Sequence, residues 1–323
     1  ELQLRVYSSK DSFSAGYINT KTDIGQHAML KIMSFPIRKI PPEKIPKYLK
    51  EIPQPPTQLT YRGTLPPSDL ILLAVVGSRK YSTYGRQALE HLLTGLAGYE
   101  VGIVSGLALG IDSLAHEAAL QHNLYTMAIP GSGLDDSVIY PSRHKALARR
   151  IIESGGSLLS EFDPYFTATK WSFAQRNRIM AGITHATLMI EATEKSGTLI
   201  TARMAVDYNR DLLVVPGNIF SLQAAGPHQF LKLGATPVTH AHDILHALSI
   251  DPDRKPASAS LFSVDTQYTE EETKILSLLA EPTEKDALIR KSELPLQTVN
   301  ALLMQMEMKG YITCIHNIYM KRE

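Results

Sequence analysis

The sequence predicts an α/β fold in which an extended Rossmann-like parallel sheet domain is followed by a C-terminal winged-helix domain. Between residues 70 and 248, short apolar runs alternate with segments of helical periodicity, which is typical of parallel strands joined by crossover helices. After residue 268, three helical patterns precede two short alternating runs on either side of His316 and Asn317, which is the order of a winged helix. The 323 residues are enough for about two domains.

The domain boundaries follow from changes in composition along the chain. Residues 1–52 contain a serine-rich polar stretch and two short helical patterns, at 28–40 and 45–51, so we expect a small degenerate helical region there. Prolines crowd residues 53–67, and they predict an extended approach to the first strand. We assign residues 53–249 to the sheet domain, 250–267 to a linker rich in proline and serine, and 268–323 to the winged helix.

Within these domains each element is predicted from its hydrophobic period. The apolar run at 70–76 predicts a strand buried on both faces, and further strands are predicted at 101–104, 125–129, 187–190 and 212–215. Helices of the sheet domain are predicted at 84–98, 111–122, 142–153, 172–181, 198–209, 227–233 and 241–248. In the winged helix we expect helices at 269–280, 286–291 and 295–309 and a hairpin of 311–315 with 318–320.

Composition limits the classes of partner and location. The formal net charge is only +1, so nucleic-acid binding requires a local basic patch. Cys314 is the only cysteine, which excludes an intrachain disulfide and a cysteine-rich zinc site and agrees with a cytoplasmic location. No apolar run approaches the roughly 20 residues of a membrane helix and no signal peptide is recognised, so no membrane partner is expected.

Polar, glycine-bearing turns follow the predicted strands. The first turn holds Gly77, Ser78 and Arg79, and others lie at residues 105–112, 130–135, 191–198 and 216–218. Because parallel strands bring their carboxyl ends to one edge of a sheet, we expect ligand binding at that edge. Exposed backbone N–H groups in such turns can bind anions. The sequence therefore predicts three anion nests, made by Ser105 and Gly106, by Gly131, Ser132 and Gly133, and by Ser196, Gly197 and Thr198.

Cations and aromatic residues near these turns favour a single strand of nucleic acid as the ligand. The guanidinium of Arg79 suits phosphate because it binds two oxygens and keeps its proton. Lys170 precedes Phe173 by three residues, and such a pair can place charge on a phosphate and a ring under a base. Phe173 would otherwise pack in the core, and Trp171 is either a second stacking platform or a buried anchor.

Two arginines of the same predicted helix leave two interpretations open. Arg176 and Arg178 could extend the positive groove toward the DNA. Alternatively, an arginine here pairs internally with Glu161 or Glu191. We expect internal pairing for one of the two arginines.

Catalytic patterns are missing from the sequence. It contains no Walker A motif, no Ser-His-Asp order, no metal-ligand cluster and no paired carboxylates, so we predict no catalytic residue, metal or cofactor. Asp112 and His116 lie four residues apart and could form a general acid/base pair. The favoured interpretation is structural, with Asp112 capping its helix and His116 hydrogen-bonded inside.

Taken in order, these turns resemble the DprA/Smf family of DNA-processing proteins of natural transformation. The resemblance covers roughly residues 53–246. It rests on Gly77-Ser78-Arg79 with Ser82-x-Tyr84-Gly85, Ser105-Gly106-x-Ala108-x-Gly110-Ile111-Asp112, Gly131-x-Gly133-x-Asp135 with Tyr140-Pro141, Phe173-x-x-Arg176-Asn177-Arg178, and Ser196-Gly197-Thr198.

The resemblance implies a binding protein rather than an enzyme. Its members bind and protect incoming single-stranded DNA, help to load the RecA recombinase and form homodimers, and Arg79, Lys170 and Phe173 take DNA-contacting positions of the family. The alternative is a small-nucleotide sensor or a phosphoribohydrolase of the lysine-decarboxylase-like group. The Pro-Gly-Gly-x-Gly-Thr signature of that group is not intact at residues 216–218 or 196–199.

Overall fold

The computed structural model describes residues 35–253, 269–279, 283–292, 294–308, 311–315 and 318–321. The chain divides into two compact units, Glu1–Ser258 and Ala259–Glu323. Most of the predicted N-terminal region 1–52 and most of the predicted linker 250–267 lie outside the described residues. Among the described residues, no helix is both long enough and apolar enough to cross a membrane.

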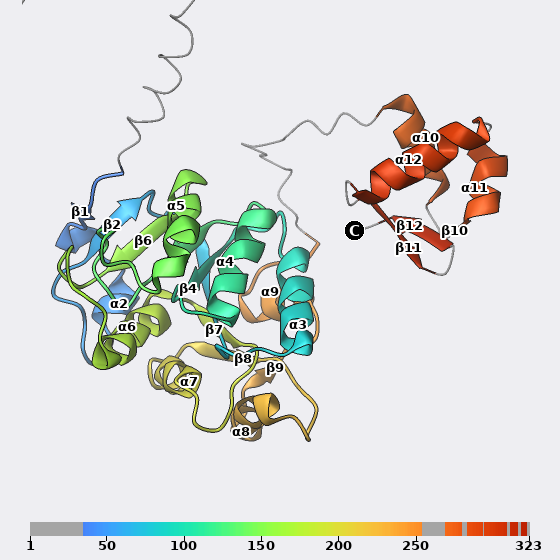
Figure 1. The fold of residues 1–323 in the computed structure, drawn as a ribbon. Helices are drawn as coiled ribbons and strands as arrows, with labels where there is room; N and C mark the ends of the chain where they lie inside the picture. The colour runs from blue at the N-terminus through green and yellow to red at the C-terminus, as the bar shows by residue number, and fades with distance from the viewer. Residues whose placement is uncertain are drawn as a thin grey trace, which may run out of the picture. The chain divides into compact units, whose positions relative to one another are not determined.

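Within residues 35–253, the first unit is built on a nine-stranded sheet with the order β1-β2-β6-β5-β4-β3-β7-β8-β9 (Figure 1). From β6 to β9 along this order, neighbouring strands are parallel. β1 pairs antiparallel with β2, and β2 pairs antiparallel with β6. The predicted α/β fold with a parallel sheet is confirmed. The strands are β1 (Arg38–Lys39), β2 (Thr60–Gly63), β3 (Ile71–Val76), β4 (Val101–Ser105), β5 (Thr126–Ala128), β6 (Ser157–Ser160), β7 (Ala186–Met189), β8 (Asp211–Val214) and β9 (Thr236–Pro237).

The strand order reverses beside β3. After β3 the chain adds β4, β5 and β6 on one side, and then returns to place β7, β8 and β9 on the other. Such a reversal is a topological switch point, where open α/β sheets form a crevice outside the carboxyl ends of their strands. The turns that follow β3 and β7 therefore meet at the place where a ligand site is expected.

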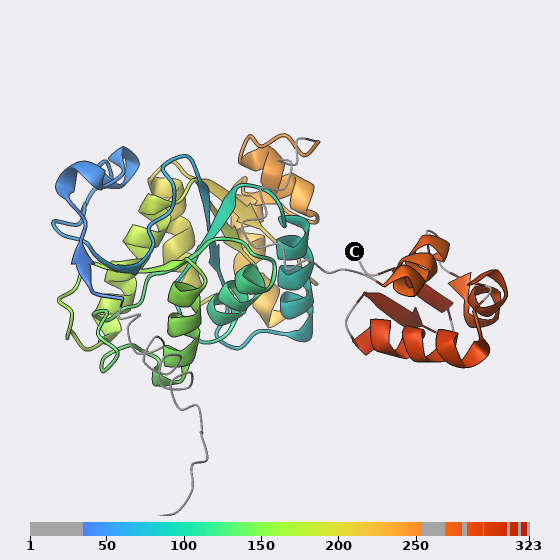
Figure 2. The ribbon, with the colours of Figure 1, turned by 90° about the horizontal axis from the view of Figure 1, so that it is seen from above.

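Helices cover both faces of this sheet (Figure 2). On one side lie α3 (Thr83–Gly95), α4 (Ile111–Gln121) and α5 (Lys145–Glu153), and on the other lie α6 (Lys170–Ile183) and α7 (Thr198–Asp207). The remaining helices of the unit are α2 (Lys47–Lys50), α8 (Ala225–Lys232) and α9 (Ala241–Ala247), with 3-10 turns at Pro42–Lys44, Ser142–His144 and Leu222–Ala224.

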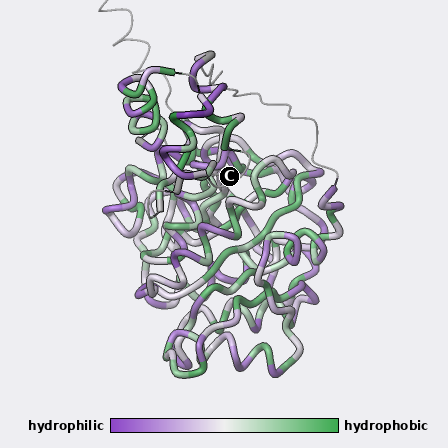
Figure 3. Tube along the Cα trace, turned by 90° about the vertical axis from the view of Figure 1, so that its right-hand side faces the viewer, coloured by the Kyte–Doolittle hydropathy of each residue, from purple (hydrophilic) through white to green (hydrophobic). Residues whose placement is uncertain are grey.

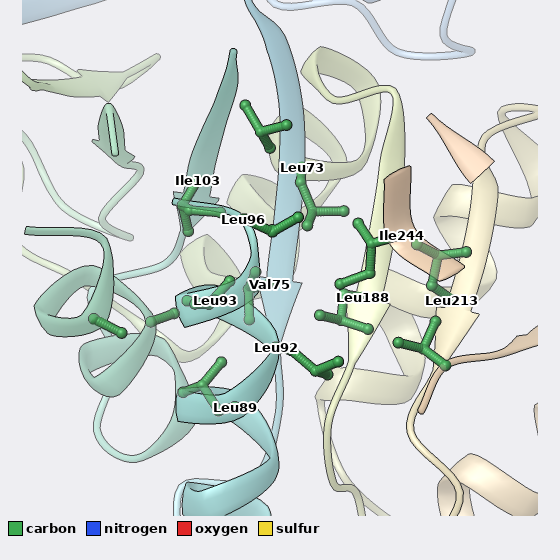
Figure 4. Close-up of a cluster of buried hydrophobic side chains, with 14 of the residues drawn as sticks. Leu73, Val75, Leu89, Leu92, Leu93, Leu96, Ile103, Leu188, Leu213 and Ile244 are labelled. Atoms are coloured by element: carbon green, nitrogen blue, oxygen red, sulfur yellow. The ribbon is translucent and has the colours of Figure 1, made fainter. Parts of the chain in front are cut away.

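β3 is buried on both faces, as its apolar run predicts. On one face Leu73 and Val75 pack against three leucines of α3 and the leucine that caps its C-terminus, which Figure 4 labels as Leu89, Leu92, Leu93 and Leu96. On the other face, Leu72 and Val76 join a second cluster with residues of α6 and α7. Burying each such side chain stabilises the fold by ~1.5–3 kcal/mol. This packing holds β3, and with it the turn that begins at Gly77, in a fixed place.

The hydropathy of the chain follows this layered arrangement. In Figure 3 hydrophobic segments alternate with hydrophilic ones along the trace of the first unit. This is the pattern expected where one face of each helix packs on a sheet and the other faces water.

The second unit, within residues 269–321, confirms the predicted winged-helix domain. Its helices are α10 (Glu270–Leu278), α11 (Lys285–Ser292) and α12 (Leu296–Met308). β10 (Thr283–Glu284), β11 (Ile312–Ile315) and β12 (Ile318–Lys321) form an antiparallel sheet in the order β10-β12-β11. Ile275, Leu288, Leu303 and Ile312 belong to its buried core.

The sequence does not predict β1, β2, β6, β9 and β10. The helix expected at 28–40 is wrong over its described part, residues 35–40, where Arg38–Lys39 form β1 and pair with β2. β6 has the sequence Ser-Leu-Leu-Ser, too short and too little alternating to indicate a strand by its period. β2 lies in the segment expected to be extended, and it becomes a strand because it pairs antiparallel with β6. A pairing between segments about a hundred residues apart, such as Thr60 with Ser160, leaves no local signal.

Candidate nucleic-acid interface

The turn after β3 is held rigidly while Arg79 projects from it. The buried Ser78 hydroxyl donates to the Lys80 carbonyl oxygen (2.9 Å) and accepts from the Lys80 N–H (3.1 Å). Gly110, with a φ of 87°, approaches this turn so closely that a Cβ would overlap the backbone of Ser78 and Arg79. The Ile111 N–H donates to the Ser78 carbonyl oxygen (3.1 Å). The turn is therefore locked to the start of α4, and the Arg79 side chain stays exposed.

The start of α6 is fixed by reciprocal capping. Thr169 is the N-cap, and its hydroxyl accepts from the Ser172 N–H (3.4 Å) while its own N–H donates to the Ser172 hydroxyl (2.9 Å). The Ser172 hydroxyl also donates to the carbonyl oxygen of Gly131, in the turn after β5 (2.6 Å). The helix thus begins against that turn, with Lys170 exposed and Phe173 half-buried one helical turn later.

The Phe173 ring is the meeting point of three segments. It lies on the backbone of Gly131, where an added Cβ would be 2.6 Å from Phe173 Cδ1. The Arg79 guanidinium carbon is 5.5 Å from the ring centroid. Tyr140 is 51% exposed, and its ring centroid lies 5.7 Å from that of Phe173, with an angle of 50° between the ring planes. The structure thus brings the predicted Arg79 and Phe173 together and adds Tyr140, which belongs to a sequence motif but was not predicted as a site residue.

Trp171 is an exposed part of the same region. Trp171 is 57% exposed, so the alternative that it is a buried anchor is wrong. The indole packs edge-on against Phe162 and Phe166, each with a centroid distance of 5.7 Å, and those two rings stack at 4.5 Å. This stack supports Trp171 in an orientation that leaves much of it in solvent. We call Arg79, Tyr140, Lys170, Trp171 and Phe173 the aromatic–cationic surface.

The predicted anion nest at Ser105 and Gly106 is wrong, because its polar groups are used inside the protein. The buried Ser105 hydroxyl donates to the carbonyl oxygen of Val75 (2.7 Å). The Gly106 N–H donates to the Asp112 carboxylate (3.1 Å), and its carbonyl oxygen accepts from the Arg176 guanidinium (2.5 Å). The turn after β4 is therefore buried and connects β3, α4 and α6 through hydrogen bonds.

The predicted nest at Gly131, Ser132 and Gly133 is closed as well, since all three residues are buried. Gly131 lies under the Phe173 ring. The Gly133 N–H donates to the Phe166 carbonyl oxygen (2.8 Å), and the Ser132 hydroxyl donates to the Gly133 carbonyl oxygen (3.0 Å). The absence of side chains at the two glycines serves close packing under the loop before α6, and not phosphate binding.

The third predicted nest is partly open. Thr198 is buried, its N–H donates to the Ser196 hydroxyl (3.2 Å), and its own hydroxyl donates to the Gly77 carbonyl oxygen (3.0 Å). These bonds tie the turn after β7 to the turn after β3 at the switch point. Gly197 is exposed, with nothing within 4 Å of the place where a Cβ would stand.

Both Arg176 and Arg178 are internal, whereas internal pairing was expected for only one of them and the other was a candidate for the groove. Arg178 is 4% exposed and forms an ion pair with Glu161. The Arg176 guanidinium is buried and donates to the carbonyl oxygens of Gly106 and Ile129. Burial lowers the pKa of Arg176 to about 10, so it stays charged at neutral pH. α6 turns this face toward the sheet, so neither side chain can reach a bound strand.

The structural interpretation of His116 is confirmed. It is fully buried, and its Nδ1 lies 2.7 Å from the Thr126 hydroxyl, which itself donates to the Ile103 carbonyl oxygen. Nδ1 is therefore the donor in this pair, and burial lowers the pKa of His116 to about 3. Asp112 does not cap its own helix but accepts from the Gly106 N–H, and burial raises its pKa.

Two protein-family models match the chain. One, described as DNA recombination-mediator protein A, matches residues 38–249. The other, described as the DprA winged helix domain, matches residues 251–316. Together they span both units of the structure.

Curated proteins and solved structures are similar to the chain over most of its length. Protein Smf of Escherichia coli (strain K12) is 36% identical over 272 residues, which cover 82% of this chain and 72% of that protein. The X-ray structure of DNA processing protein A from Streptococcus pneumoniae is 38% identical, with a TM-score of 0.60 and coverage of 69% of this chain and 77% of that one. A structure of DNA processing protein A from Helicobacter pylori, described by its single-stranded DNA binding mode, is 28% identical, with a TM-score of 0.58 over 67% of this chain and 97% of that one.

Proposed function

Because the chain belongs to the family of DNA recombination-mediator protein A, also called DprA or Smf, we propose that it binds single-stranded DNA at the aromatic–cationic surface. The observation that supports this most directly is the exposed guanidinium of Arg79 beside the half-buried ring of Phe173. A cation for the phosphate next to a ring for the base is the arrangement by which proteins follow an unpaired strand.

In this proposal Arg79 contacts the strand first, and Phe173 then receives a base. Without a strand, Arg79 rests on the ring, and such a contact is worth ~0.5–1 kcal/mol at an exposed site. A charge-assisted hydrogen bond to phosphate is worth ~1.5–3 kcal/mol. Arg79 therefore exchanges the ring for the phosphate, which uncovers the ring for a base. Lys170 supplies a second phosphate contact one turn before Phe173. The buried Arg176, whose pKa the nearby Arg79 also lowers, adds positive potential without touching the strand.

We extend the proposal to the role that the family implies. The protein protects incoming single-stranded DNA during natural transformation and helps to load RecA onto it, as a homodimer in the cytoplasm. This part rests on family membership alone. It describes a binding protein, in which Asp112 and His116 serve the fold.

Replacing Arg79 by Ala is expected to weaken the binding of oligo-dT and to change its salt dependence. Each phosphate contact to a single strand contributes ~0.7 to the slope of log affinity against log salt concentration. Fluorescence-anisotropy titrations at several salt concentrations should show a slope flattened by about this amount, and Lys170→Ala should behave in the same way. Arg150→Ala, on the exposed face of α5, is the matched control and should keep the slope of the unmodified chain. An unchanged slope in both test variants would mean that the strand runs elsewhere.

Replacing Phe173 should weaken binding without changing the salt slope, because stacking on a base releases no counterions. Phe173→Ala is expected to cost ~1–3 kcal/mol of binding free energy with nearly the same salt slope. Phe173→Leu distinguishes stacking from packing, since a side chain of similar volume is tolerated in a core but offers no aromatic face. Both variants should weaken binding of oligo-dT and keep a melting temperature close to that of the unmodified chain. If Phe173→Leu binds normally, the ring is a packing residue only.

A further inference from the structure

A cavity of about 410 Å³ lies on the other side of the switch point from the aromatic–cationic surface. It opens at the carboxyl ends of β7 and β8, beside the N-terminus of α3. Small-molecule sites are commonly ~300–1,000 Å³, and in open α/β sheets they lie at such an edge. Its lining residues include Ser82, Tyr84, Glu191, Pro216, Asn218 and Ser221.

The walls of the cavity suit a flat heterocycle. Ile190, Val215 and Ala224 contribute apolar surface, and the Tyr84 ring adds an aromatic wall. The Tyr84 hydroxyl donates to the Pro216 carbonyl oxygen (2.6 Å), which fixes the ring across the space between α3 and the turn after β8. Apolar walls with a few fixed polar groups are the usual composition of a base-binding or cofactor-binding pocket.

Glu191 gives the cavity its chemical character. Glu191 is 4% exposed, and its carboxylate accepts hydrogen bonds from the Ser82 N–H (2.9 Å) and the Ser82 hydroxyl (2.5 Å). The carboxylate fills the space beside Gly85, where a Cβ would overlap it. The N-terminus of α3, where a nucleotide phosphate would otherwise be attracted, is thus held by an anion of the chain itself. None of the residues described as lining the cavity is a lysine or an arginine.

We propose that this cavity is a nucleobase pocket that takes an unpaired guanine of the bound strand, an inference that rests on the proposed single-strand binding. A carboxylate has about four acceptor positions, and Ser82 uses two of those of Glu191. Guanine presents two adjacent donors, N1–H and N2–H, which match the two oxygens of a carboxylate. Adenine, cytosine and thymine each place an acceptor next to their donor, and that acceptor would face the negative charge.

The pocket and the aromatic–cationic surface can serve one strand. Ser82, which holds Glu191, is three residues from Arg79 in the turn after β3. A phosphate on Arg79 therefore leaves a neighbouring nucleotide near the cavity. In this arrangement Glu191 admits a neutral base and excludes a free nucleotide whose phosphate would enter beside it.

The test uses the full chain and labelled oligo-dT in which one central thymine is replaced by guanine, hypoxanthine or adenine. The guanine-containing strand should bind roughly tenfold tighter than oligo-dT, since a good bidentate contact discriminates by about that factor or more. Hypoxanthine lacks the N2 donor, so it should lose most of the gain, and adenine should show none. The ratio between guanine and thymine strands should stay constant with salt, because a base contact releases no counterion.

Glu191→Gln should bring the guanine-to-thymine ratio close to one, while the exposed Glu194→Gln, three residues along the same loop, should leave it unchanged. The comparison of bases on the unmodified chain keeps the test decisive if Glu191→Gln does not fold. Equal affinity for all four strands would overturn the guanine pocket and leave single-strand binding intact. Failure to bind any of the strands would overturn the proposed function itself.

Discussion

Replacing Glu161 by Gln should lower the free energy of unfolding by about 3–5 kcal/mol, a large share of the stability of an ordinary domain. The substitution keeps the shape of the side chain but removes the charge that pairs with Arg178. The Arg178 side chain is only 5% exposed, so the guanidinium would be left buried without a counter-charge. Urea denaturation of the two chains, followed by circular dichroism, measures the loss.

A second substitution separates the ion pair from the DNA surface. In the Glu161→Gln background, Arg178→Met removes the uncompensated charge and should recover most of the lost stability, because an apolar side chain of similar length packs where the cation was. The double variant should also bind oligo-dT with the affinity and salt slope of the unmodified chain. If Arg178→Met instead flattens the salt slope, Arg178 contacts the strand and is not an internal residue.

Lowering the pH should destabilise the protein through His116. Its pKa is about 3 in the folded state and about 6.5 when unfolded, so between these values the unfolded chain binds the additional proton. The free energy of unfolding therefore falls as the pH decreases through this window, by up to about 1.4 kcal/mol per unit for this one group. Between pH 7 and pH 4 the contribution amounts to about 3 kcal/mol.

The His116→Asn variant isolates this contribution from that of the carboxylates. Asparagine keeps a donor near the Thr126 hydroxyl but has no proton to gain in this range. The difference in unfolding free energy between the unmodified chain and the variant should therefore shrink by about 3 kcal/mol between pH 7 and pH 4. His242→Asn, at an exposed position of α9, should leave the pH dependence as it was. A difference that stays constant with pH would show that His116 is accessible to protons when folded.

Local sequence pattern was sufficient for five of the parallel strands, β3, β4, β5, β7 and β8. The residues of β3 are apolar throughout, and the buried leucines of α3 recur at helical spacing, so both elements can be predicted from their own sequences. β2 and β6 were not visible in the same way, because Thr-Tyr-Arg-Gly and Ser-Leu-Leu-Ser hold no apolar run longer than two residues and are completed by pairing with each other. Capping explains a smaller difference: Thr169 and Ser172 start α6 at Lys170, two residues before the predicted start.

For the candidate site, the sequence identified side chains as candidate contacts, but it did not predict how the backbone groups are used. The Arg79 guanidinium lies 5.5 Å from the half-buried Phe173 ring, and Lys170 is exposed one helical turn before that ring; their contact with DNA stays a prediction. The glycines at positions 106 and 131 were expected to offer N–H groups to phosphate. Instead, they allow Arg176 and Phe173 to pack against their backbones. A glycine in a turn after a strand marks a close approach, and only the three-dimensional structure tells whether a ligand or another part of the chain makes it.

The decisive measurement compares the affinity of the protein for single-stranded DNA with its affinity for duplex DNA. The full chain is titrated by fluorescence anisotropy with labelled oligo-dT and with a duplex of the same length at one salt concentration. Stacking on Phe173 and the neighbouring aromatics requires unpaired bases, so the single strand should bind at least several-fold tighter than the duplex. Equal affinity for the two would mean that only phosphate charge is recognised, and it would contradict the assignment of the aromatic–cationic surface to single-stranded DNA.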